Sequence, residues 1–370
     1  MSKHPSLQEF FDSPGALAAD LNMSASASEP LTQDELLAFE PNAAARFNEI
    51  KLTYPRRHAE LELLDGISRR YRAVPSEGLL PTSGIDEALG MLFLSLVEAG
   101  DRVVVLTPCY PPHLMLPEWR GAEVVPWAAR SENDWVPDLG ELRRLTTQRT
   151  RLVITTFPQN PTGFMPDEAF NAELLEIIEA SGAILVADEI YAGLPAGAAD
   201  GLSNLADRHD RVISLHGLSK TMGLPGLRLG WMAARDPALL EPIREVRTLF
   251  NAYVPPPVDF LANLALRHED TILARNSRIL ETGKRAAADF MTRHGNLFEW
   301  TEPRAGVLSF PRWTGPGGTS ALSQRLLAEA KLVCAPSLCF DADDQHFRVG
   351  LARHSLPKAL QRFDAFLERL

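Results

Sequence analysis

Between about residues 70 and 235, short runs rich in β-branched residues alternate with longer segments of helical periodicity. The runs are apolar at successive positions, which is typical of strands that are buried on both faces of a sheet. Between two of them, Phe170, Leu174 and Ile178 recur at helical spacing, and Gly182 ends the segment. Repeated strand, helix, strand units predict an α/β fold with a mostly parallel sheet flanked by helices. The expected strands cover residues 102–107, 122–127, 151–156, 183–188, 211–216 and 228–234.

A second, smaller domain is indicated by a change of pattern after three consecutive prolines, Pro255 to Pro257. A long helical stretch over about residues 258–294 is followed by short strands and a final helix from residue 356. The length of 370 residues also exceeds the usual ~100–200 residues of one domain. We therefore expect a large domain over residues 46–255, a small α+β domain over 256–370, and an N-terminal arm over 1–45 that packs with the small domain.

The charge balance is acidic, with 37 Lys and Arg against 48 Asp and Glu and a net charge of -11. Such a chain repels nucleic-acid phosphates and anionic lipids, so neither nucleic acid nor a membrane is an expected partner. The N-terminal segment lacks the continuous apolar stretch of a signal peptide. Cys109, Cys334 and Cys339 have no CxxC spacing and no neighbouring histidine at metal-ligand spacing. We expect a reduced, cytoplasmic setting and no metal site.

Polar side chains follow the predicted strands at the points where the strands end. The residues at the ends of these apolar runs are Tyr110, Asn160, Asp188, Tyr191 and Lys220. In open α/β sheets, ligands bind beyond the carboxyl ends of the strands, so these residues are candidates for one site. Each has an ordinary alternative: a solvated lysine, a strand-end carboxylate, an Asn-Pro turn, or a phenol in the core. Their joint occurrence favours a functional site.

An anion site is predicted upstream of these residues. Thr82, Ser83 and Gly84 precede a segment with a helical apolar face, and the exposed amides of a first helical turn bind anions. Arg228 adds a guanidinium that suits a phosphate group. Pyridoxal phosphate requires a lysine amine, a carboxylate at its ring nitrogen, donors to its phenolic oxygen, an aromatic plane and phosphate anchors. The sequence therefore predicts a pyridoxal phosphate site.

Four motifs carry a resemblance to a known family: "NPTG" (160–163), "DEIY" (188–191), "SKTMGLPGLRLGW" (219–231) and "FRVGLAR" (347–353). In their order and spacing, the chain from about residue 50 to its end resembles the fold type I, aspartate-aminotransferase-like superfamily of pyridoxal-phosphate enzymes, in its class I and II branch. The segments "NMSASASEPLT" and "EPRAGVLSFPR" are similar to the capreomycidine-synthase-like branch of secondary metabolism.

The resemblance implies a role for each candidate. Lys220 forms the internal aldimine with the cofactor and moves the proton of the substrate's Cα, with Asp188 at the pyridine nitrogen. The other implied contacts are Asn160 and Tyr191 to the phenolic oxygen, Tyr110 to the ring plane, and Arg228, Ser219, Ser83 and the amides of Gly84, Ile85 and Asp86 to the phosphate. For the substrate, Arg348 binds the α-carboxylate, with Ala25, Asn160 and Tyr110 nearby. Tyr54 crosses to the partner's phosphate in a homodimer.

Two positions depart from the family pattern. Gly217 stands where many members carry a phosphate-binding serine, and Asp86 stands where a hydroxyl residue is usual. Acidic-substrate aminotransferases of the family bind the distal carboxylate of the substrate with an arginine before the proline run at 255–257. The segment 246–257 has no arginine at that place, and its one arginine is Arg247, so aspartate and glutamate are not the expected substrates. The leading hypothesis is an aminotransferase that acts on an α-amino acid with a keto acid as acceptor. A lyase, cyclase or oxidase that uses the same cofactor, or a non-catalytic cofactor-binding regulator, are the alternatives.

Overall fold

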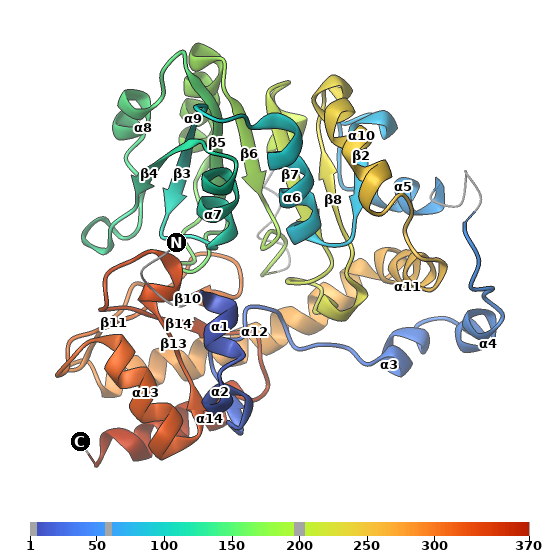
Figure 1. Ribbon diagram of the computed structural model, residues 1–370. Coiled ribbons are helices and arrows are strands. Elements are labelled where there is room, and N and C mark those ends of the chain that lie inside the picture. Colours follow the sequence, from blue (N-terminus) through green and yellow to red (C-terminus); the bar gives the residue numbers. More distant parts are fainter. Residues whose placement is uncertain (1–5, 56–60, 196–203, 370) are drawn as a thin grey trace.

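The central element of the fold is a seven-stranded sheet with the strand order β2-β8-β7-β6-β5-β3-β4 (Figure 1). The computed structural model describes residues 6–55, 61–195 and 204–369. The strands β3 to β7 run parallel, and β8 runs antiparallel to both of its neighbours, β7 and β2. The sheet strands are β2 (Leu79–Thr82), β3 (Arg102–Thr107), β4 (Glu123–Ala128), β5 (Thr150–Thr156), β6 (Ile184–Asp188), β7 (Val212–Gly217) and β8 (Gly230–Ala233). The predicted α/β class with a mostly parallel sheet is confirmed, and the six predicted strands match within two or three residues.

The strand β2, with the sequence "LLPT", was not among the predicted strands. Proline cannot donate a hydrogen bond to a neighbouring strand, so it is tolerated at the edge of a sheet and not in its centre. Pro81 lies in β2 and Pro126 in β4, and these two strands form the two edges. The two prolines therefore agree with the observed strand order.

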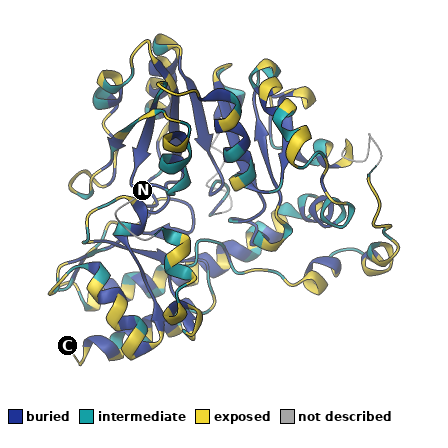
Figure 2. Ribbon diagram, in the orientation of Figure 1, coloured by how far each residue is buried: buried dark blue, intermediate teal, exposed yellow. Residues whose placement is uncertain are grey.

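Helices cover both faces of the sheet because successive strand residues point to opposite sides. In β3, Val103 and Val105 pack in one apolar cluster with α6, α7 and α10, whereas Val104 and Leu106 pack in another with α5, α8, α9 and α11. Figure 2 shows the inner strands of the sheet buried and the outer sides of these helices exposed, whereas the edge strand β4 is only partly buried. The helices are α5 (Leu61–Ser68), α6 (Ile85–Leu96), α7 (Pro112–Trp119), α8 (Leu139–Leu145), α9 (Glu168–Ser181), α10 (Glu241–Phe250) and α11 (Pro256–Arg267).

A separate apolar cluster lies below the sheet in Figure 1, around Phe290, Phe347 and Phe363. Its helices are α12 (Glu269–Arg293), α13 (Thr319–Ala330) and α14 (Leu356–Leu367). Its short strands are β9 (Phe298–Glu299), β10 (Leu308–Ser309), β11 (Arg312–Trp313), β12 (Leu332–Val333), β13 (Ala335–Pro336) and β14 (Phe347–Gly350). The strands β10, β14 and β13 form one antiparallel sheet, and β11 pairs with β9.

The N-terminal segment joins this second cluster. Its strand β1 (Leu21–Asn22) pairs in parallel with β12, and Leu21 and Met23 are buried in the same cluster. The remaining N-terminal helices are α1 (Leu7–Phe11), α2 (Pro14–Leu17), α3 (Gln33–Leu37) and α4 (Ala43–Asn48). The division of the chain at residues 45 and 255 stays a prediction.

The helical stretch predicted over residues 258–294 is two helices. His268 leaves the helical region, with φ of -112° and ψ of 22°, and it separates α11 from α12. The two helices then serve different clusters, because α11 packs with the sheet and most of α12 packs with α14. Within the described ranges, no helix combines the length and the apolar composition that crossing a bilayer requires.

Candidate active site

A cavity of about 110 Å³ lies beyond the carboxyl ends of the parallel strands. Ten of the residues predicted for the site line it: Ile85, Asp86, Tyr110, Asn160, Asp188, Tyr191, Ser219, Lys220, Arg228 and Arg348. They come from segments more than 250 residues apart, which meet because the strands end at one edge of the sheet. Four further residues, Leu7, Ser26, Ile190 and Pro225, also line the cavity and were not predicted.

Lys220 follows β7 and directs its amine into this cavity. The amine lies 2.9 Å from the hydroxyl of Ser26 and 5.9 Å from the ring centroid of Tyr191. Burial, together with the neighbouring charge of Arg348, lowers the pKa of Lys220 from 10.5 to about 8. A substantial fraction of the amine is therefore neutral near pH 8, which is the form that attacks a carbonyl group.

Asp188 is the last residue of β6, and it is buried. One carboxylate oxygen accepts a hydrogen bond from the backbone N–H of Ile190 at 3.2 Å. The other lies 3.4 Å from Nε2 of His113, a buried residue of α7. His113 was not among the residues predicted for the site. Its place one helical turn beyond Tyr110, at the end of β3, was the available signal.

Arg348 lies in β14, and only 2% of it is exposed. Its guanidinium donates to the carbonyl oxygen of Ser24 at 2.9 and 3.1 Å and to the amide oxygen of Asn160 at 3.3 Å. Burial lowers the pKa of Arg348. Both acceptors are neutral, so the positive charge suits an anion that enters the cavity.

The first turn of α6 lies beside Arg228. Gly84 has φ of 88°, and among the described residues no side chain caps this helix start. A Cβ atom at Gly84 would lie 2.6 Å from a guanidinium nitrogen of Arg228, the end of a flexible side chain, so the positive φ rather than this approach favours glycine. The same guanidinium lies 3.3 Å from Asp86, which also accepts a hydrogen bond from the hydroxyl of Tyr110 at 2.9 Å. Amides and a guanidinium thus form one wall of the cavity.

The structure gives a physical reason for Gly217. This residue ends β7 opposite Gly230 of the antiparallel strand β8. A Cβ atom at Gly217 would lie 2.8 Å from the carbonyl oxygen of Leu229 and 2.9 Å from the Cα of Gly230. A serine therefore cannot be placed here without moving β8.

The other residues predicted for the site do not line this cavity. The hydroxyl of Ser83 accepts a hydrogen bond from Asn251 at 2.5 Å. The carbonyl oxygen of Ala25 lies against Gly350, and Gly84 lies against the guanidinium of Arg228. Tyr54 is 87% exposed, and its ring centroid lies 6.5 Å from that of Tyr253. These positions leave the predicted roles of Ser83, Ala25 and Tyr54 as predictions.

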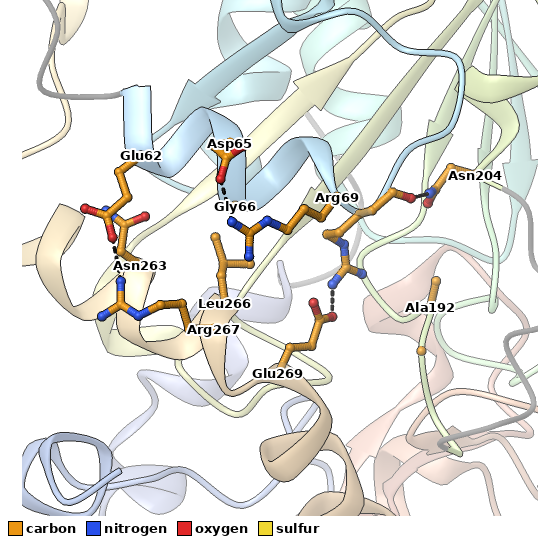
Figure 3. Close-up of a pocket in the computed structure, with 12 residues that line it drawn as sticks. Glu62, Asp65, Gly66, Arg69, Ala192, Asn204, Asn263, Leu266, Arg267 and Glu269 are labelled. Carbon is orange, nitrogen blue, oxygen red and sulfur yellow. Dashed lines mark hydrogen bonds and ion pairs between the residues drawn. The ribbon is translucent and has the colours of Figure 1, made fainter. Parts of the chain in front are cut away.

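A larger cavity, of about 330 Å³, lies between α5 and α11 (Figure 3). Its charged groups pair with one another: Arg69 with Asp65 at 2.6 Å, and Arg267 with Glu62 at 2.5 Å. Arg70 likewise pairs with Glu269. None of the predicted site residues lines this cavity. The predicted site residues that line a cavity therefore line the smaller one and not this one.

Comparison with known proteins agrees with this geometry. Residues 27–363 match the family described as aminotransferase class I and II. The chain belongs to this family. Its cofactor is pyridoxal phosphate.

Individual members of the class I and II family differ in their reported activities. The chain is 32% identical to a capreomycidine synthase of Streptomyces vinaceus, over 77% of this chain and 73% of that protein. A pyridoxal-phosphate-dependent aminotransferase from Streptococcus suis is 29% identical with a TM-score of 0.89, over 95% of this chain and 94% of that one. A pyridoxal-phosphate-dependent cyclase, OrfR, is 26% identical with a TM-score of 0.88, over 100% and 98%. An aminotransferase and a cyclase therefore share this fold at similar identity.

The residues of the cavity fit the cofactor of the family. The amine of Lys220 has a lowered pKa, and the carboxylate of Asp188 is buried in the lining of the same cavity. The uncapped start of α6 and the guanidinium of Arg228 suit a phosphate. The phenol of Tyr110 is held by Asp86, so its ring has a fixed place in the cavity wall.

Proposed function

We propose that this chain is an aminotransferase that acts on an α-amino acid, with a keto acid as acceptor. The observation that carries the proposal is that Lys220, Asp188 and Arg348 line one cavity, where an amine, a buried carboxylate and a buried guanidinium face a common space. These are the groups that Cα chemistry on an amino acid requires.

The residues predicted for the site would make distinct contacts with the cofactor. When bound, pyridoxal phosphate supplies a carbonyl group that reacts with amines and a ring that accepts an electron pair. Asp188, held by His113, would keep the ring nitrogen protonated. Asn160 and Tyr191 would hold the phenolic oxygen, and Tyr110 would lie against the ring. Arg228, Ser219 and the amides of Gly84, Ile85 and Asp86 would hold the phosphate.

Toward the substrate, Arg348 binds the α-carboxylate by paired hydrogen bonds. The amine of Lys220 would accept and move the proton of the substrate's Cα. Burial lowers its pKa to about 8, so a substantial fraction of the amine is neutral near that pH and can accept this proton.

We also propose that two copies of the chain form a dimer in which Tyr54 reaches the partner's phosphate site. Leu52, Tyr54, Leu249, Phe250 and Tyr253 are exposed, and Tyr54 lies beside Tyr253. Large apolar side chains gathered on a surface are typical of an interface. Covering them with a second copy would remove them from water.

A second candidate is a lyase, cyclase or oxidase that uses the same Cα deprotonation. It is favoured by the similarity to a capreomycidine synthase and to the cyclase OrfR. After Cα has lost its proton, loss of a β-substituent followed by ring closure competes with amino transfer. The residues of the cavity support the shared first step in either case.

Turnover with a panel of amino acids, with and without a keto acid, distinguishes the two candidates. Transamination requires the keto acid for continued turnover and consumes one per amino acid. Sustained turnover in its absence overturns the transaminase proposal and supports the second candidate. In either case Lys220→Ala should be inactive, whereas Lys358→Ala, at an exposed lysine of α14, should retain activity.

A further inference from the structure

The segment of residues 24–28 alternates serine with alanine and runs directly over the lysine loop, which is residues 218–229 between β7 and β8 and contains Lys220. The backbone N–H of Ser28 donates to the carbonyl oxygen of Lys220 at 2.9 Å. At its other end, the hydroxyl of Ser24 donates to the carbonyl oxygen of Arg348 at 2.6 Å and accepts from the N–H of Ala335 at 2.7 Å. The segment is therefore fixed at both ends, and Ser26 lies between them.

Two glycines make room for this segment. A Cβ atom at Gly223 would lie 2.7 Å from the carbonyl oxygen of Glu29, and one at Gly350 would collide with the carbonyl oxygen of Ala25. The N–H of Gly350 also donates to the carbonyl oxygen of Met23 at 2.7 Å. The backbone on both sides of Ser26 is thus held closely enough to fix where its hydroxyl points.

The hydroxyl of Ser26 contacts two groups of the active site. It accepts a hydrogen bond from the amine of Lys220 at 2.9 Å, and it also lies beside the phenol of Tyr191, where it opposes the rise that burial causes in the pKa of that phenol. A hydroxyl has one donor and two acceptor positions, so both contacts are satisfied together. Ser24 and Ser28, in contrast, make backbone contacts that hold the segment.

We propose that Ser26 is a positioning residue whose hydroxyl holds the free amine of Lys220 beside Tyr191 and so fixes the direction from which that amine takes a proton. This rests on the proposed function, in which Lys220 acts as the base. Because Ser26 comes from the N-terminal segment, the base is oriented only when that segment lies over the lysine loop.

The test measures the amine of Lys220 itself, in the full-length protein freed of its cofactor. Acetic anhydride is applied over a range of pH, and mass spectrometry compares the acetylation of Lys220 with that of the exposed Lys51 in the same molecules. Charged groups that face Lys220 are Arg348 on β14, Arg228 beside the lysine loop, Asp86 on α6 and Asp188 on β6, and all remain in the variants. A change in the pH at which acetylation of Lys220 is half-maximal, the midpoint, therefore measures the effect of the Ser26 hydroxyl.

In Ser26→Ala, the ammonium form of Lys220 loses a hydrogen bond, so the midpoint for Lys220 should fall by about one pH unit. At pH values below the midpoint, Lys220 should then be acetylated about tenfold faster. Ser26→Thr should restore the wild-type midpoint. Ser28→Ala is the matched control, because its hydroxyl is buried in the same segment and has no hydrogen-bond partner among the described residues.

An unchanged midpoint in Ser26→Ala would overturn the role of Ser26. An equal shift in Ser28→Ala, or in Ser26→Thr, would also overturn it, because the packing of the segment would then set the midpoint. None of these results bears on whether Lys220 binds the cofactor. That separate question is decided by the activity and absorbance of Lys220→Ala.

Discussion

The imidazole of His113 lies against the carboxylate of Asp188, with 3.4 Å between Nε2 and the nearer oxygen. His113 belongs to the helix after β3, and Asp188 ends β6. The two meet because β3, β5 and β6 are consecutive in the sheet. Both side chains are buried, and a buried carboxylate needs polar partners. His113 and the N–H of Ile190 thus place polar groups beside the carboxylate of Asp188, which lines the cavity.

Asp188→Asn should leave the fold intact and remove the negative charge from the cavity. We expect the rate of the first half-reaction with an amino acid to fall at least ~100-fold, because the ring nitrogen of the cofactor loses its stabilising charge. Stopped-flow absorbance measures this rate. Asp210→Asn, at an exposed carboxylate paired with Arg235, is the control and should react as the wild type does. A rate within threefold of wild type, roughly 0.7 kcal/mol, would remove Asp188 from this role.

Much of the fold, and the placement of Asp188 and Lys220 at one edge of the sheet, could be predicted from the sequence for a physical reason. Strands buried on both faces are continuous apolar runs, and parallel strands end together, so Asp188 and Lys220 could be placed at one edge. Ser26 and Leu7 could not, because they come from an N-terminal segment without periodicity. The alternation of serine and alanine around Ser26 was the available signal. Nor does local periodicity show the break at His268, which divides α11 from α12.

The glycines of the lysine loop are not equivalent. Gly223 has φ of 69°, and an added Cβ would lie 2.7 Å from the carbonyl oxygen of Glu29. At Gly226, a Cβ meets nothing within 4 Å. We expect Gly223→Ala to destabilise the loop by at least ~1–2 kcal/mol and to weaken cofactor binding, because it adds strain and displaces residues 28 and 29.

Gly226→Ala is the matched control in the same loop and should bind cofactor as the wild type does. Equilibrium dialysis of pyridoxal phosphate and the thermal midpoint of unfolding measure the two effects. Equal behaviour of the two variants would show that the close approach of Glu29 to the loop does not support the site.

Glu189 gives the stability of the protein a pH dependence. Burial raises its pKa from 4.5 to about 7, against the opposing hydrogen bonds from Ser214 and the N–H of Leu205. Between pH 4.5 and 7 the folded protein keeps a proton that the unfolded chain has lost, so this contribution to stability is complete below pH 4.5 and is lost as the pH rises through 7.

Glu189→Gln cannot ionise, so we expect it to stabilise the cofactor-free protein at pH 8 by on the order of 2 kcal/mol and to have little effect near pH 4.5. Scanning calorimetry at the two pH values provides the measurement. Glu118→Gln, at an exposed position, should change neither value. A destabilised variant at pH 8 would mean that the ionised carboxylate is better accommodated than its burial indicates.

The proposed crossing of Tyr54 between subunits predicts complementation. Lys220→Ala and Tyr54→Ala should each be nearly inactive alone. In a mixed dimer, the intact Lys220 of one chain meets the intact Tyr54 of the other, so equal mixing should restore about a quarter of wild-type activity. Activity is assayed after the two variants are unfolded and refolded together. Mixing that restores no activity, or a monomer in sedimentation velocity, would contradict the proposal.

The most direct test of the central claim is to find which lysine holds the cofactor. Borohydride reduction of the protein with bound pyridoxal phosphate joins the two permanently, and peptide mass spectrometry then locates the modified residue. Modification of Lys220, with loss of the visible absorbance band in Lys220→Ala but not in Lys358→Ala, is the predicted result. Modification of a different lysine, or a visible band that persists in Lys220→Ala, would contradict the assignment of this site.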